Sequence, residues 1–372
     1  MMILENQMGI ELKVGGENIP LGPGNLESIS IMQNMQNISG VAEFAITDTM
    51  NKFENGIFSD QAPVELALGP AFDGQIPPTQ SFRLFNIQEV FPTTSGTSIK
   101  FTAVFNAPEL FRKPMSKAYK GTSAEAIGAM ARDAGVQFET TGTADSMTWL
   151  PNSRPFGQAM RKIADHGSAG GTSAMHLTMG TTGDGQWKLM YKDLIAQLQS
   201  EGKAKFISLN MFTGEGFPIF HVKGRNHSGT LNSQLSGGSI IQTKLSGKTE
   251  IDSLFEAMQS TAKLNINMAV KDAIGKLPPL VAPFDGGNTH KDYTKAQMQN
   301  EKLKGTLSGF LDCVTNYFTN VAVMDPVDVL LGNGEQINQV LSGRYIVNSR
   351  TQFVKGHLYR EKLTLASQGS NK

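Results

Sequence analysis

Apolar and polar residues alternate over much of the first hundred or so positions, which is the period-two pattern of half-buried strands. The alternation is clear in four runs, at residues 10–14, 41–46, 82–87 and 99–105. A segment that contains Pro92 and Gly96 separates the last two runs, and this arrangement predicts a long hairpin. Several antiparallel strands in so short a stretch predict a small barrel or a sandwich.

Helical spacing replaces this alternation after Pro108. Residues 122–125 have the spacing of a capping box, and apolar residues follow at helical intervals until Gly135. A second predicted helix begins at Pro155, where proline suits the first turn, and ends at Gly167. A third helix is predicted over residues 193–201, so this part of the chain is expected to be a small α/β module.

Strand-like patterning returns over residues 207–223 and 239–245, and again from residue 303 onward. Between these runs, residues 251–277 keep their apolar side chains close to one helical face, which predicts a long helix that ends at the following two prolines. The polar segment 291–302 predicts another helix. These patterns divide the chain into a first β unit (1–108), an α/β module (109–206), a second β unit (207–250 with 303–372) and a helical insertion (251–302).

The last predicted strands form a hairpin, with runs at residues 345–353 and 358–365 around a turn at Gly356. An isolated two-stranded hairpin is marginally stable in water at best. Its partner strands must therefore lie earlier in the sequence, and we expect the hairpin to complete a second barrel.

Charge and cysteine content narrow the classes of function. The 33 basic and 33 acidic residues cancel, which disfavours a protein that neutralises the phosphates of a nucleic acid or docks on anionic lipid. The single cysteine, Cys313, excludes an internal disulfide. The first residues do not have the pattern of a signal peptide and no segment has the roughly 20 apolar residues of a membrane span, so we expect synthesis in the cytoplasm and no membrane insertion.

Motifs that could carry chemistry are incomplete. The segment 246–249 (Ser-Gly-Lys-Thr) resembles the end of a phosphate-binding loop, but Gln242 stands where the loop needs glycine, so we expect a turn that enters the long helix. Ser168 lacks the glycine of a nucleophile elbow, because His166 occupies that position. The six histidines show no metal-binding spacing.

A carboxylate pair for sugar chemistry depends on tertiary structure, and nothing in the sequence singles out Glu139, Asp145 or Glu215. The aromatic residues Phe217, Phe220, Tyr317 and Phe318 are expected in a core or a subunit contact. We therefore predict no catalytic residues, no cofactor and no metal.

Three stretches resemble the baseplate hub, or tail hub, proteins of contractile-tailed bacteriophages and related contractile injection systems. They are the strand pair 82–87 with 99–105, the segments 119–127 and 149–156 of the α/β module, and the closing hairpin 343–347 with 356–359 and 363–365. Their order across most of the chain carries the resemblance.

The resemblance implies an α+β, β-rich fold with two small tail-tube-like antiparallel β-barrels and inserted α/β and helical modules. It implies a homotrimer that forms a ring of six barrels and joins the tail tube to a central spike, with a channel for tape measure protein and DNA. The chain stops soon after the second barrel, so the trimeric spike is expected to be a separate protein. Other expected partners are the tail tube protein and surrounding baseplate proteins, with DNA only transiently in the channel, and the expected location is the virion.

The residues that we expect to matter for assembly lie in the closing hairpin, where edge strands would pair or pack between neighbouring subunits. They are Gly343, Tyr345, Val347, Gly356, Tyr359, Leu363 and Leu365. Two alternatives stay open: a β-rich cell-wall glycan hydrolase or glycan-binding tail module, and a tube subunit of unusual length that forms six-fold rings.

Overall fold

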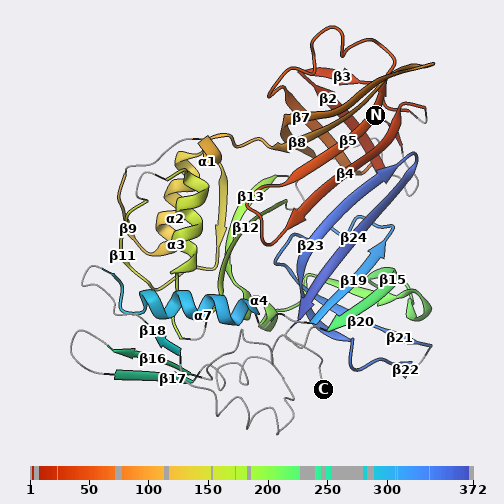
Figure 1. Ribbon diagram of the computed structural model, residues 1–372. Coiled ribbons are helices and arrows are strands. Elements are labelled where there is room, and N and C mark those ends of the chain that lie inside the picture. The colour runs from red at the N-terminus through yellow and green to blue at the C-terminus, as the bar shows by residue number, and fades with distance from the viewer. Residues whose placement is uncertain are drawn as a thin grey trace.

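The computed structural model describes most of the chain and shows a β-rich molecule with two barrel-like units (Figure 1). The described residues are 2–3, 8–22, 24–71, 78–112, 117–151, 154–171, 173–181, 186–226, 239–243, 249–253, 280–282, 289–305, 307, 309–334 and 336–367. No helix among them is long and apolar enough to span a membrane.

The first barrel is a curved antiparallel sheet with the strand order β2–β6–β7–β8–β5–β4. Its strands are β2 (Met8–Val14), β4 (Leu26–Asn34), β5 (Val41–Asp48), β6 (Pro63–Pro70), β7 (Thr79–Thr93) and β8 (Gly96–Phe105), and short β1 (Met2–Ile3) and β3 (Glu17–Ile19) pair with β2. Alternate side chains point inward, and Phe44 stacks on Phe101 with ring centroids 4.7 Å apart in the shared core. The predicted hairpin is β7–β8.

The second barrel is closed, because its six strands return to the first one in the order β23–β20–β14–β15–β19–β24–β23. They are β14 (Ala204–Ser208), β15 (Phe217–Asn226), β19 (Gly309–Thr315), β20 (Pro326–Leu330), β23 (Gly343–Lys355) and β24 (Leu358–Ser367). All neighbours are antiparallel except β14, which runs parallel to β15 and β20. A short helix η3 (Leu209–Met211) and a small hairpin, β21 (Gly332–Asn333) with β22 (Gln336–Ile337), lie beside this barrel.

The α/β module follows the first barrel. It contains α1 (Glu109–Arg112), β9 (Tyr119–Gly121), α2 (Ser123–Asp133), β10 (Gln137–Thr140), β11 (Met147–Trp149), α3 (Phe156–Asp165), β12 (Met175–Thr181), β13 (Trp187–Asp193) and α4 (Leu194–Gln199). Strands β10, β13 and β12 form one sheet, and β9 pairs with β11. The capping box exists at the start of α2, where Thr122 and Glu125 exchange side-chain and backbone hydrogen bonds.

The region after the second barrel's first strands departs from the prediction. Residues 251–253, expected to begin the long helix, belong to strand β17 (Thr249–Ser253), which pairs with β16 (Ser239–Thr243), and β18 (Leu280–Ala282) pairs with β16 on its other side. The run 239–245 was expected in the second barrel, but β16 belongs to this separate sheet. Pairing between β-branched segments overrides the helical spacing here.

Residues 254–277 of the expected helix lie outside the described part of the chain. The other helix predicted in this region, over 291–302, is α7 (Tyr293–Gly305).

Candidate functional site: the closing hairpin

The closing hairpin β23–β24 belongs to both barrels. On one edge β23 pairs with β24 along most of its length. On the other edge its first part pairs with β20 and its later part, from Ser349 to Lys355, pairs with β4 of the first barrel. The register shifts between Val347 and Ser349, where the partner changes. In Figure 1 the two blue strands accordingly extend from the second barrel to lie beside β4.

The buried side chains of the hairpin are likewise divided between the two barrels. Tyr345, Val347, Leu363 and Leu365 belong to the core of the second barrel, whereas Tyr359 belongs to the core of the first. The other two predicted residues are glycines: Gly343 pairs with Val329 at the start of β23, and Gly356 has φ 57° in the turn, a conformation that glycine adopts without steric cost. The structure therefore gathers all seven predicted residues on one hairpin, but in two different cores.

A buried polar cluster separates these two apolar parts. Glu361, which is fully buried, accepts hydrogen bonds from Arg350 Nε at 2.6 Å, from Thr319 Oγ1 at 2.6 Å and from the hydroxyl of Tyr359 at 3.0 Å. The backbone N–H of Thr319 also donates to Glu361, at 3.1 Å. The guanidinium carbon of Arg350 lies 5.3 Å from the centroid of the Phe318 ring. The carboxylate is thus fully engaged, which a buried charge requires.

Burial and neighbouring charges shift the pKa values of two residues in this cluster. Burial lowers the pKa of Arg350, but the charges of Glu361 and Tyr359 and the hydrogen bonds to both side chains together outweigh it, so the net shift is upward. The pKa of Tyr359 is raised well above its usual value, first by burial and then by the nearby Glu361 carboxylate. This ion pair was not predicted from the sequence. Arg350 and Glu361 occupy inward positions of strands whose other inward residues are mostly apolar, and such a charge becomes informative only once its partner is known.

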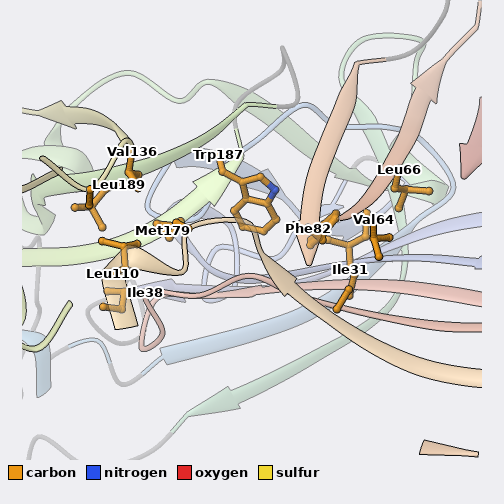
Figure 2. Packing of buried hydrophobic residues seen from close by; sticks show 14 of the residues in the cluster. Ile31, Ile38, Val64, Leu66, Phe82, Leu110, Val136, Met179, Trp187 and Leu189 are labelled. Atoms are coloured by element: carbon orange, nitrogen blue, oxygen red, sulfur yellow. The ribbon is translucent and has the colours of Figure 1, made fainter. Parts of the chain in front are cut away.

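A large side chain of the α/β module packs against the first barrel. Trp187 of β13 points toward Phe82, with ring centroids 5.6 Å apart, and lies 5.3 Å from Phe105 (Figure 2). Gly40 makes room for it, because a Cβ at that position would lie 1.7 Å from the indole ring. The module and the first barrel therefore share one packed core.

An ion-pair network fastens the same module to the second barrel. Lys192 Nζ of β13 lies 2.6 Å from Glu139 and 3.9 Å from the buried Asp325, and Lys203 Nζ lies 2.6 Å from the same Asp325 carboxylate. Burial raises the pKa of Glu139, but the hydrogen bond and charge of Lys192 together with the charges of Lys203 and Lys188 lower it by more, so the net shift is downward. The module is in this way held against both barrels.

The residues considered for chemistry have structural roles. Asp145 accepts hydrogen bonds from the hydroxyl and backbone N–H of Ser123, at 2.6 and 2.8 Å, and from the backbone N–H of Ser168 at 2.6 Å. The His166 ring stacks on Tyr293 with centroids 3.8 Å apart, and burial lowers its pKa. These contacts hold the loop after α3.

The remaining candidates are dispersed. No group of three or more potential metal ligands occurs within the described ranges. Residues 246–248 of the Ser-Gly-Lys-Thr segment lie outside those ranges, and Thr249 begins β17, so the expected helix start there is wrong. Phe217 packs against Phe206 with centroids 5.9 Å apart, Phe318 lies at the buried cluster, and Glu215 and Tyr317 are exposed.

Comparison with known proteins gives matches at the level of structure. No protein-family model and no curated protein sequence matches the chain. A tail protein from Neisseria meningitidis MC58 matches with a TM-score of 0.58 and 12% identity over 97% of this chain and 96% of its own. The 43 kDa tail protein of prophage MuSo2 from Shewanella oneidensis matches with a TM-score of 0.59 and 10% identity, over 97% of this chain and 98% of its own.

A third solved structure comes from a secretion machine. It is an E. coli component of the type VI secretion system, described as structurally similar to the T4 bacteriophage tail proteins gp27 and gp5, and it matches with a TM-score of 0.54 and 8% identity over 96% of this chain and 78% of its own. The resemblance predicted from the sequence is confirmed at the level of the fold. The chain therefore has the fold of the phage tail and baseplate hub proteins.

Proposed function

We propose that the protein is a structural hub of a phage-type tail or contractile injection machine, and that three copies form a ring of six barrels. The observation that carries this proposal is the shared hairpin. Because β23 pairs with both β20 and β4, the two barrels of one chain are joined through backbone hydrogen bonds of a single strand. Three such pairs arranged about a three-fold axis present six similar barrels.

The ring would join the tail tube protein on one face to a separate trimeric spike on the other. The two barrels of the chain differ, because the α/β module is packed into the end of the first one through Trp187. A ring of alternating, unequal barrels can meet a six-fold tube on one face and a three-fold spike on the other. Its centre would form the channel for tape measure protein and DNA, in the virion.

Mass photometry and negative-stain class averages of the purified protein, alone and with the tube or spike protein, test the proposal. We expect trimers with three-fold rings about a central hole. A monomer under all of these conditions would overturn the proposal. Six-fold rings would instead favour a tube subunit, and binding to or turnover of peptidoglycan would favour a glycan-active tail module.

A further inference from the structure

Helix α7 is held against the α/β module by buried polar side chains. Asn300 donates from Nδ2 to the carbonyl of Gly167 and accepts the backbone N–H of Met175, both at 2.9 Å. The neighbouring Gln299 donates to two further carbonyls, within the segment 171–173. In Figure 1, α7 accordingly lies across the end of α3. A polar contact of this kind is stable only while each buried donor and acceptor keeps its partner.

Two histidine rings enclose the first residue of α7. His166, at the end of α3, stacks on the ring of Tyr293 with centroids 3.8 Å apart and planes 6° apart. His290 meets Tyr293 edge-on at 5.5 Å and lies 5.8 Å from the ring of Trp149 on β11. Both histidines are buried. The start of α7 is therefore packed against the module through two titratable side chains.

The hydrogen bonds of His290 require a neutral ring. Its Nε2 lies 2.9 Å from the carbonyl oxygen of His166, which can only accept, so this nitrogen carries the hydrogen. Its Nδ1 accepts the backbone N–H of Asp292 at 3.3 Å, so this nitrogen carries none. A proton added to Nδ1 would oppose that N–H and would place a positive charge at the N-terminus of α7, where the helix dipole disfavours it.

The ring of His166 is also unfavourable for a positive charge. Its Nδ1 lies 3.2 Å from the carbonyl oxygen of Tyr293 and donates to it, so an added proton would have to enter at the other ring nitrogen. Burial lowers the pKa of His166, and this outweighs the opposing effects of the Tyr293 carbonyl and of Asp165. The nearby Lys162 and His290 lower the pKa further.

The charged groups around the two rings do not compensate an added positive charge. Lys162 belongs to α3, and Lys291 and Asp292 follow His290 in the chain. The carboxylate of Asp165 lies 3.8 Å from Nζ of Lys304. Among the described residues, no carboxylate is hydrogen-bonded to either histidine ring.

We propose that α7 is a pH-sensitive latch, whose N-terminal end is docked on the α/β module at neutral pH and leaves it in acid, when His290 and His166 take up protons. Because docking requires neutral rings, it is complete above about pH 6.5, the ordinary pKa of histidine, and is lost as the pH falls below that value. Each proton lowers the docking equilibrium by up to about tenfold per pH unit. A cavity of about 220 Å³ beside Trp149 and Tyr293 gives protons access to the rings.

Hydrogen exchange of the full-length protein tests the latch. It is followed by mass spectrometry at about pH 7.5 and about pH 5 and corrected for the intrinsic exchange rate. We expect the protection of the α7 amides to fall at least tenfold more than that of β8 and β24, because the barrels keep their own strand pairing. Unchanged protection of α7 would overturn the latch, as would an equal loss in α7 and the two strands.

The two histidines are tested by the variant His166→Asn/His290→Asn. Asparagine offers a donor and an acceptor near the position of Nδ1 but does not titrate, so α7 should stay protected at both pH values. His221→Asn/His357→Asn is the matched control, since both side chains are exposed, and it should keep the acid response. Burial lowers the pKa of His176 to about 3, so that ring does not titrate in this range. Equal acid responses in the two variants would overturn the role of the latch histidines.

Tryptophan fluorescence gives a second readout that leaves all histidines in place. Trp149 is 3% exposed and packs against His290 and Tyr293, whereas Trp187 lies at the first barrel. On acidification over the same range, the emission of Trp187→Phe should shift to longer wavelength, because Trp149 becomes exposed when α7 leaves. The emission of Trp149→Phe should not shift. A shift of the same size in both variants, or in neither, would overturn the latch.

Discussion

The two barrels of this chain differ in how their edge strands are paired. The second barrel closes on itself through the β23–β24 pairing. The first barrel has no pairing between β2 and β4 within the described residues; its β2 edge is taken by β1 and β3, and its β4 edge by β23 of the second barrel. The first barrel therefore depends on the second for its last strand partner, and the closing hairpin is the element that both need.

Two natural probes allow the barrels to be compared in one experiment. Trp187 lies in the core of the first barrel, and a Trp149→Phe background makes it the single tryptophan reporter. Cys313, the one cysteine, lies in the core of the second barrel and is 1% exposed, so its reaction with a thiol reagent reports opening of that barrel. Each variant below is followed with both probes during denaturation by urea.

The largest effect is expected at the cluster that lies between the two cores. Glu361→Gln leaves the buried Arg350 without its counter-charge, and removing one partner of a buried pair costs about 3–5 kcal/mol. Because the hairpin serves both barrels, the tryptophan and thiol transitions should shift together. The double variant Arg350→Met/Glu361→Leu should recover most of the loss, and a shift confined to one probe would contradict the shared role.

A smaller effect is expected from crowding the first barrel alone. In Gly40→Ala the new Cβ would lie 1.7 Å from the indole of Trp187, so the ring must move, and such overpacking costs about 1–3 kcal/mol. The tryptophan transition should shift to lower urea concentration by more than the thiol transition. Gly24→Ala is the matched control, since nothing lies within 4 Å of a Cβ there. Equal shifts of both probes would show that the barrels do not unfold separately.

Local patterns predicted the individual strands well, whereas they could not predict how distant strands combine. The alternation in residues 82–87 and 99–105 predicted the β7–β8 hairpin, and the capping box at Thr122 predicted α2. The pairing of β4 with β23 joins segments about three hundred residues apart, and no local pattern encodes such a contact. Helical spacing over 251–277 was misleading at 251–253, because strand partners decide the conformation there.

The strands of the closing hairpin were predicted from the sequence, whereas its buried ion pair was not, for the same reason. Tyr345, Leu363 and the turn at Gly356 follow from period-two alternation and turn preferences. The ion pair of Arg350 with Glu361 depends on which side of the hairpin is covered, and that in turn depends on Thr319 and the loop around it. A charged residue at an inward position is a signal only when its partner is known.

The stability of the second barrel is expected to depend on pH through its buried cysteine. Burial raises the pKa of the Cys313 thiol to about 12. A thiol pKa that is raised in the folded state stabilises the fold in full at pH values below the pKa of the unfolded thiol, near 8.5. This stabilisation is lost as the pH rises toward 12, by about 1.4 kcal/mol per pH unit. Between pH 9 and 10 the wild type should lose about this much more stability than Cys313→Ala, measured by circular dichroism in urea. Identical losses in the two proteins would contradict the raised pKa.

The smallest effect on stability is expected for two ion pairs, one from each barrel. Arg344 bridges Asp328 through two hydrogen bonds, of 2.6 and 3.2 Å, across the β20–β23 joint that helps to close the second barrel. Lys13 and Glu65 lie 3.7 Å apart on the exposed surface of the β2–β6 joint in the first barrel. Exposed single contacts contribute about 0–1 kcal/mol, and two-point arginine contacts lie at the upper end of that range. Asp328→Asn should therefore shift the thiol transition slightly, while Glu65→Gln should leave the tryptophan transition unchanged within error. A larger effect of Glu65→Gln would mean that solvent screening, and not the two-point geometry, decides what a cross-strand ion pair contributes to stability in this fold.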